Sequence, residues 1–258
     1  MADYSQIDQS PLLGFLFYPR KDVTPCPEGA FDLMIPVENE IVIACRFFAR
    51  EKAWPWILYF HGNGEVASEY NDIAPLFQKR GINLVVADYR GYGASSGSPN
   101  FTNLLRDSHP ILHGVRGELS RKDFGEDLWV MGRSMGSLAA VELAYHDADG
   151  LKGVVIESGF ASVSRLIKHL HLPSRGLELE PIERERLNLI REISLPALIL
   201  HGEKDSLVPL QEGKDLFSQL GSKKKEMVII PRADHNTILL AGMKQYFDAL
   251  EKFVHETR

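Results

Sequence analysis

The sequence predicts an α/β fold, in which a mostly parallel central sheet of about eight strands is covered by helices on both faces. Two observations carry this prediction. Short apolar runs alternate along the chain with longer amphipathic runs, as expected when strands alternate with helices. Most of the short runs are apolar at every position rather than at every second one, which is typical of strands buried on both faces of a parallel sheet.

The strands are expected at short runs that consist mainly of β-branched, leucine and aromatic residues. Most of these runs stop at a polar, glycine or proline residue, which is where a loop is expected to begin. In chain order the predicted strands are 41–48, 56–60, 83–87, 128–131, 153–156, 197–200 and 227–230.

The helices are expected at the longer runs between these strands. Apolar residues there recur at helical spacing, as at Leu104, Ile111 and Val115, and one run is rich in Ala, Leu and Met. In chain order the predicted helices are 73–79, 101–119, 134–145, 210–220 and 237–254.

One stretch, residues 160–193, breaks the alternation. It contains no predicted strand, and Pro173, Gly176 and Pro181 interrupt its helical pattern. We therefore expect a single domain over residues 1–258, with residues 160–193 as a lid or cap insert. The apolar side chains of this insert could line an acyl or aryl pocket, or they could pack the insert onto the sheet: Phe160, Leu166, Ile167, Leu170, Leu172, Leu177 and Leu179.

Composition narrows the class of protein. Of the 258 residues, 44% are hydrophobic and 25% are charged, as in ordinary globular domains. The net charge of −6 disfavours nucleic acid as a partner, because binding the phosphate backbone needs a basic face. Two cysteines provide no disulfide framework. With no secretion signal and no apolar run long enough to span a membrane, a cytoplasmic protein is expected.

The strongest local motif is Gly132-Arg133-Ser134-Met135-Gly136, a G-x-S-x-G pattern. It lies directly between a predicted strand and a predicted helix, where a sharp turn would expose the Ser134 hydroxyl at the sheet edge. The same pattern recurs around Ser95, but in a Gly/Ser/Pro stretch with no helix directly after it, so a loop role is expected there. Taken alone, Ser134 could also be a helix N-cap.

A serine hydroxyl needs a base to become nucleophilic, and candidates follow two later strands. In a strand–helix elbow of this kind the expected chain order is serine, acid, histidine. Asp205 follows the run 197–200, and His235 follows the run 227–230, so both are expected at the carboxyl edge of the sheet with Ser134. Asp234 and Glu203 are rival acids, and Asp234 is disfavoured because it is adjacent to the histidine.

The same edge should also supply an oxyanion hole, which needs two hydrogen-bond donors. One is expected to be the backbone N–H of Met135, directly after the serine. The other is expected in His61-Gly62-Asn63-Gly64, which follows the strand 56–60, with the Asn63 N–H as first choice and Gly64 as the fallback. A plain glycine turn is the alternative interpretation of this segment.

Together these motifs resemble the α/β-hydrolase family, and the resemblance covers nearly the whole chain. The segment Asp88-Tyr89-Arg90-Gly91-Tyr92-Gly93-Ala94-Ser95-Ser96-Gly97 is similar to one in serine hydrolases of the Bem46 and serine-aminopeptidase-like branch. Asp88 and Arg90 are interpreted there as scaffolding, a charge pair that holds the loop. The chain departs from the branch after Asn63, where Gly64-Glu65-Val66 replaces the common Ala-Gly-Asn.

The resemblance implies acyl transfer to water by a triad of Ser134, Asp205 and His235, with Asn63 and Met135 at the oxyanion hole. The expected substrate is a small carboxylic ester or thioester, and no metal or organic cofactor is needed. His169 and His171 form no metal-ligand pattern, so a surface or lid role is expected for them. A peptidase or amidase, an acyltransferase, and a non-catalytic binding protein of the same fold are the alternatives.

Overall fold

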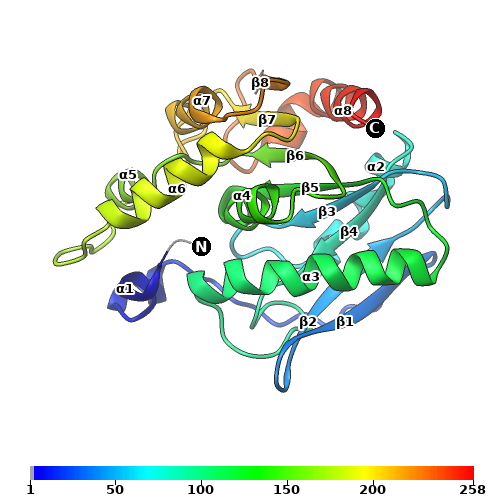
Figure 1. Cartoon of the computed structure of the whole chain (residues 1–258), viewed down its shortest axis with the longest axis horizontal. Helices are drawn as coiled ribbons and strands as arrows, with labels where there is room; N and C mark the ends of the chain where they lie inside the picture. The colour runs from blue at the N-terminus through cyan, green and yellow to red at the C-terminus, as the bar shows by residue number, and fades with distance from the viewer. Residues whose placement is uncertain (1–2) are drawn as a thin grey trace.

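Eight strands form a single sheet within residues 3–258, the part of the chain that the computed structural model describes (Figure 1). The strand order across the sheet is β1-β2-β4-β3-β5-β6-β7-β8. β2 pairs antiparallel with both β1 and β4, and all other neighbours are parallel. The bounds are β1 Ala30–Glu38, β2 Ile41–Phe48, β3 Trp56–Phe60, β4 Asn83–Ala87, β5 Leu128–Arg133, β6 Leu151–Glu157, β7 Ala197–Gly202 and β8 Lys225–Ile230. The predicted fold class is confirmed.

Seven of these strands lie where the apolar runs predict them, and β1 is the strand that has no predicted counterpart. Every residue of the central strands β3 and β4 is buried, which explains their unbroken apolar sequences. β1 is instead an edge strand with only one fully buried residue, Ile35. It carries Pro36 next to a register irregularity, a position where an edge strand tolerates the missing N–H.

Helices cover both faces of the sheet, and each layer has its own core (Figure 1). α2 (Ala74–Gln78) and α8 (Ile238–Glu256) pack on one face together with the 3₁₀ helix η2 (Ala67–Asn71). The other face carries α3 (Phe101–Arg121), α4 (Ser137–His146), α5 (Val163–His169), α6 (Glu180–Glu192) and α7 (Leu210–Gln219). The short α1 (Ser5–Asp8) and the 3₁₀ helix η1 (Pro11–Phe15) join that second core through Ile7 and Leu12.

The segment 160–193 forms α5 and α6, joined by a loop that extends outward at one end of the sheet (Figure 1). Pro173 and Gly176 lie in that loop, whereas Pro181 lies in the first turn of α6 and so marks the beginning of a helix. Many apolar side chains of the segment pack inward. Phe160 and Ile167 are buried in the core, and Leu166, Leu172, Leu177 and Leu179 pack against it.

The parallel strands β3 to β8 all end at the same edge of the sheet, so the loops that follow them meet there. These are the loops that contain the predicted site residues. None of the helices within residues 3–258 has the length and apolar character that a membrane crossing requires.

Candidate active site

Ser134 lies on a tight turn between β5 and α4. Its backbone φ is +51°, in the left-handed region that non-glycine residues rarely adopt. β5 ends at Arg133, the 3₁₀ helix η3 covers Ser134–Gly136, and α4 follows at once. This strained conformation brings the serine to a helix N-terminus, where the backbone dipoles favour negative charge.

The flanking glycines make this turn possible. A Cβ at Gly132 would lie 2.3 Å from the carbonyl oxygen of Gly136, and a Cβ at Gly136 would lie 2.1 Å from the carbonyl oxygen of Phe60. Both obstacles are backbone atoms and cannot move aside. The G-x-S-x-G spacing is therefore imposed by the approach of β5, α4 and β3 to one another.

His235 and Asp205 are hydrogen bonded to each other at the sheet edge where this turn lies. Nδ1 of His235 lies 2.8 Å from Oδ2 of Asp205, and both side chains are buried. The other oxygen of Asp205 accepts the backbone N–H groups of Leu207 at 3.1 Å and Val208 at 2.7 Å. Burial alone would raise the pKa of Asp205, but the hydrogen bonds from His235 and Val208 outweigh it and lower the pKa below its ordinary value.

The rival residues have other partners. Asp234 accepts hydrogen bonds from the backbone N–H of Ser206 at 2.9 Å and from the N–H of His235 at 2.6 Å, so it supports the loop and not the imidazole. Glu203 accepts the N–H of Arg232 at 2.9 Å. Ser95 is fully buried, and its hydroxyl accepts the N–H of Ala44 at 2.9 Å, which is a structural role.

The second ring nitrogen of His235, Nε2, is not used by the bond to Asp205. Nε2 is buried and has no hydrogen-bond partner among residues 3–258, although its ring is held firmly through Nδ1. Ser134 therefore shares the sheet edge with His235 without a hydrogen bond to Nε2 in this structure. Contacts of this kind are often long in the absence of substrate and shorten only when it binds.

Asn63 is held in the loop after β3 by its own side chain. Its Oδ1 accepts hydrogen bonds from the N–H of Tyr18 at 3.0 Å and the hydroxyl of Tyr92 at 2.6 Å. Its Nδ2 donates to the carbonyl oxygen of Leu16 at 2.9 Å. The side chain is thus occupied in fixing the loop, which leaves the backbone amide as the group that Asn63 could offer to a ligand. The partner donor proposed from the sequence, Met135, is the second residue of η3 and is buried.

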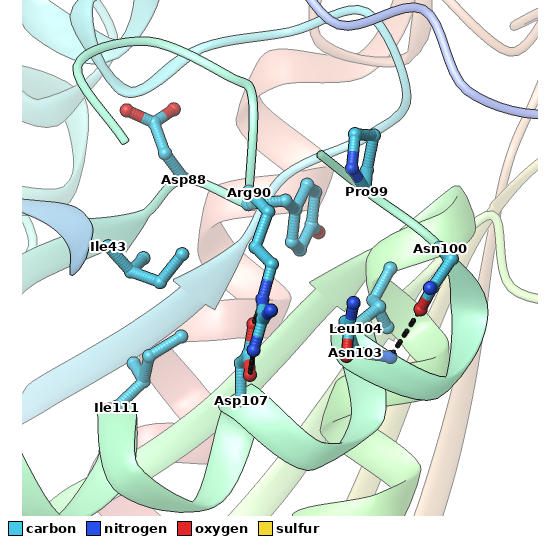
Figure 2. Close-up of a pocket in the computed structure, with 10 residues that line it drawn as sticks. Ile43, Asp88, Arg90, Pro99, Asn100, Asn103, Leu104, Asp107 and Ile111 are labelled. Carbon is cyan, nitrogen blue, oxygen red and sulfur yellow. Dashed lines mark hydrogen bonds and ion pairs between the residues drawn. The ribbon is translucent and has the colours of Figure 1, made fainter. Parts of the chain in front are cut away.

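Asp88 and Arg90 do not pair with each other, so that part of the sequence interpretation is wrong. Arg90 binds Asp107 of α3 through two hydrogen bonds, of 2.6 and 2.8 Å, and contacts Glu38 at 2.9 Å. Figure 2 shows the guanidinium turned toward Asp107 and away from the Asp88 carboxylate. Asp88 instead contacts the His61 ring at 3.2 Å. Both residues are scaffolding, but each fastens a different pair of segments.

Sequence reasoning missed a largely buried charged cluster beside the elbow, formed by Arg133, Glu65 and Glu157. Arg133 contacts both carboxylates, with Nε at 3.0 Å from Glu157 and Nη1 on Glu65. Burial would lower the pKa of Arg133, but the two negative charges raise it well above its ordinary value. Burial would likewise raise the pKa of Glu65, but the Arg133 charge and the hydrogen bonds from Tyr70 and Gly62 together hold that pKa below its ordinary value. The sequence offered one indication of this cluster, because Arg133 and Glu157 are charged residues at the ends of the apolar strands β5 and β6.

The family model described as "Serine aminopeptidase, S33" matches residues 52–180 and 182–239 of this chain. The chain belongs to this family of α/β-hydrolases. The resemblance noted from the sequence is thereby confirmed. Curated proteins similar to this chain include the uncharacterised protein YfhR of Salmonella typhi, 31% identical over 75% of this chain and 68% of YfhR. Protein bem46 of Schizosaccharomyces pombe is 31% identical over 78% of this chain and 68% of bem46.

Solved structures share the fold of this S33 family member. An esterase of Pyrococcus furiosus, Pf2001, superposes with a TM-score of 0.75 over 93% of this chain and 97% of its own, at 16% identity. Est1E of Butyrivibrio proteoclasticus, solved with ferulic acid bound, gives a TM-score of 0.68 over 87% of this chain and 98% of its own, at 18% identity. At such identities the likeness establishes the fold.

The described part of this S33 chain contains no group of three or more His, Cys, Asp or Glu side chains arranged to hold a metal ion. His169, one of the histidines expected in a surface or lid role, is exposed and contacts the carbonyl oxygen of Ser206 at 2.8 Å. That contact joins the 160–193 segment to the loop that follows β7. His171 is exposed as well.

Proposed function

We propose that this chain is a serine hydrolase that cleaves carboxylic ester or thioester bonds through a covalent acyl-enzyme on Ser134. His235 serves as the base, Asp205 orients it, and the backbone amides of Asn63 and Met135 form the oxyanion hole. The proposal makes the chain a carboxylesterase or thioesterase of the S33 family.

One observation carries this proposal. The imidazole of His235 is fixed by Asp205 through Nδ1, while Nε2 is buried without a partner at the sheet edge that also presents the strained Ser134. Buried polar atoms without partners are rare in folded proteins, so this Nε2 fits a base that receives a proton during the reaction. A base held in the correct tautomer beside a nucleophile requires this arrangement.

The chemistry follows from these roles. Nε2 of His235 takes the hydroxyl proton as Ser134 attacks the carbonyl carbon, and Asp205 stabilises the imidazolium that forms. The oxyanion is bound by the two backbone amides, and each such donor contributes about 3 kcal/mol to transition-state stabilisation. The imidazolium protonates the leaving alcohol or thiol. His235 then activates water, which releases the carboxylic acid and restores Ser134.

The substrate class is proposed from the structural neighbours. The names of Pf2001 and of the Paleococcus ferrophilus monoacylglycerol lipase describe an esterase and a lipase, and Est1E was solved with ferulic acid. These names favour a carboxylic ester over an amide. The family description points to peptide bonds, so an amide or peptide substrate is the second candidate.

We also propose that residues 160–193 act as a cap that determines selectivity. The segment begins three residues after the end of β6, at the sheet edge where Ser134 lies, and a hydrogen bond from His169 to Ser206 joins it to the loop containing Asp205. Side chains of the segment that are only half-buried, such as Leu170, are the ones available to contact an acyl group.

The test is hydrolysis of a series of nitrophenyl acyl esters, thioesters and anilides by the wild-type protein and two serine variants. Ser134→Ala is expected to lower kcat by about 10³-fold or more, because the nucleophile is lost. The control is Ser95→Ala, which removes a serine from the second G-x-S-x-G pattern and should leave kcat within about threefold. Unchanged turnover by Ser134→Ala would refute the proposal, and cleavage of anilides alone would assign the second candidate.

A further inference from the structure

Arg133 occupies the variable position of the G-x-S-x-G turn, and its guanidinium contacts three separate segments. Its side chain is only 11% exposed. Nε donates to Glu157 at the end of β6 at 3.0 Å, and Nη1 donates to Glu65 in the loop after β3. Nη2 donates to the backbone carbonyl of His235 at 2.8 Å and to Oδ1 of Asn236 at 2.9 Å. One side chain thus joins the turn to the loop that contains Asn63 and to the loop that contains His235.

Glu65 links Arg133 to the backbone of the loop that contains Asn63. Its Oε2 accepts the backbone N–H of Gly62 at 3.1 Å and the hydroxyl of Tyr70 at 2.7 Å. Gly62 directly precedes Asn63, whose amide is the proposed oxyanion donor. A Cβ at Gly62 would lie 2.5 Å from Nη1 of Arg133 and 2.6 Å from Oε1 of Glu65. Glycine therefore lets the ion pair lie directly against the backbone of this loop.

Glu157 holds the guanidinium from the opposite side. It is 2% exposed, and its Oε2 accepts the hydroxyls of Tyr59 at 3.2 Å and Tyr246 at 2.7 Å. Both carboxylates are thus bonded by tyrosine hydroxyls as well as by the arginine, which makes the network rigid. The geometry of this network requires arginine, because only a planar fork of several donors reaches four acceptors on three segments at once.

We propose that Arg133 is a positioning residue that fixes the Asn63 loop and the His235 loop relative to Ser134, acting through Glu65 and through the His235 carbonyl. The inference rests on the proposed function for the roles of Asn63 and His235. The hydrogen bonds of the Arg133 guanidinium go to Glu65, Glu157, His235 and Asn236, and none goes to the Ser134 hydroxyl. Arg133 acts by aligning the base, His235, with the oxyanion donor, the Asn63 amide. This alignment lowers the energy of the transition state more than it strengthens substrate binding.

The first variant to test is Arg133→Lys, which keeps the charge but loses the fork. We expect kcat to fall by about 10- to 100-fold, because a displacement of about 1 Å in a site has effects of that size. KM should change by less than about threefold, since ground-state contacts are not removed. Glu65→Gln keeps an oxygen for the Gly62 N–H and should lower kcat less than Arg133→Lys does. If Arg133→Lys fails to fold, Glu65→Gln carries the kinetic test.

The matched control is Arg90→Lys. Arg90 is 8% exposed and pairs with Asp107 of α3 through two hydrogen bonds (Figure 2), and its third hydrogen bond goes to Glu38 of β1, so its guanidinium bonds neither the Asn63 loop nor the His235 loop. Replacing it should lower the melting temperature about as much as Arg133→Lys does, while kcat stays within about threefold. Equal losses of kcat in the two variants would mean that Arg133 acts through general stability, which would overturn the proposal.

Amide hydrogen exchange provides a readout that does not depend on activity. Arg133→Lys should raise exchange in residues 62–66 and in residues 235–237 together, whereas Arg90→Lys should raise it in neither segment. Unchanged exchange in both segments of Arg133→Lys would overturn the positioning role even if kcat fell. If the wild-type protein neither hydrolyses esters nor reacts at Ser134, the proposed function fails, and the exchange result still decides whether Arg133 connects the two loops.

Discussion

The substitution Asp205→Asn should reverse the tautomer of His235. In the structure, Oδ1 of Asp205 accepts two backbone N–H groups, from Leu207 and Val208, and Oδ2 accepts Nδ1–H of His235. Asparagine has one oxygen, and the two N–H donors from the backbone require it at the Oδ1 position. The NH₂ group must then face Nδ1, so the imidazole carries its proton on Nε2 and cannot act as a base.

The expected loss is large. An imidazole in the wrong tautomer lowers kcat by about 10⁴-fold, which corresponds to about 5 kcal/mol of transition-state stabilisation. The matched control is Asp234→Asn. Asp234 bonds only loop N–H and hydroxyl groups, and an amide oxygen can replace most of those bonds. Weakening them by about 1 kcal/mol should lower kcat by no more than about fivefold.

The assay is steady-state ester hydrolysis, with circular dichroism to show that both variants are folded. Because the backbone N–H groups retain an acceptor in Asp205→Asn, we expect that variant to fold. If Asp234→Asn loses kcat by thousands while Asp205→Asn retains it, the assignment of the acid is wrong. If both retain it, the histidine needs no carboxylate and the triad interpretation fails.

Two further predictions concern stability. Gly136→Ala should fail to fold or lose at least about 3 kcal/mol of unfolding free energy in denaturant melts, because its Cβ would meet the Phe60 carbonyl. Gly117→Ala has open space around its Cβ and should gain about 0.5–1 kcal/mol of unfolding free energy. Equal effects of the two substitutions would contradict the packing argument. The pKa of Asp205 is lower in the folded protein than its ordinary 3.8, so its contribution to stability is present above that pH and is lost as pH falls through the folded pKa. The difference in unfolding free energy between wild type and Asp205→Asn should therefore shrink from pH 7 to pH 2, and a constant difference would contradict this.

Much of the fold could be predicted because buried parallel strands have unbroken apolar sequences. β3 and β4 illustrate this, since every one of their residues is buried and their predicted bounds match the structure. β1 could not be predicted in the same way. It is a half-exposed edge strand, so polar residues and Pro36 interrupt its apolar pattern, and its place depends on pairing with β2.

The candidate site was predictable where chain order and strand ends determine position. Ser134, Asp205 and His235 each follow a recognisable strand, and parallel strands bring such ends to one edge. The partners of charged side chains were not predictable, because they depend on packing in three dimensions. Arg90 lies two residues from Asp88 yet reaches Asp107 on α3.

Arg133 shows the same limit. It pairs with Glu157 because β5 and β6 lie side by side in a register that places the two residues opposite each other. Its contact with Glu65 depends in addition on the position of the loop after β3. The G-x-S-x-G motif leaves this position free, so nothing in the motif itself indicates the network that the arginine forms.

The most direct test of the central claim is labelling with a fluorophosphonate, followed by mass mapping of the adduct. The reagent reacts with a serine only when a base activates it and an oxyanion hole stabilises the addition. The account predicts one adduct per chain, located on Ser134, and no adduct in denatured protein or in Ser134→Ala. Labelling of the folded protein at another serine, or no labelling at all, would contradict the claim that Ser134 is an activated nucleophile.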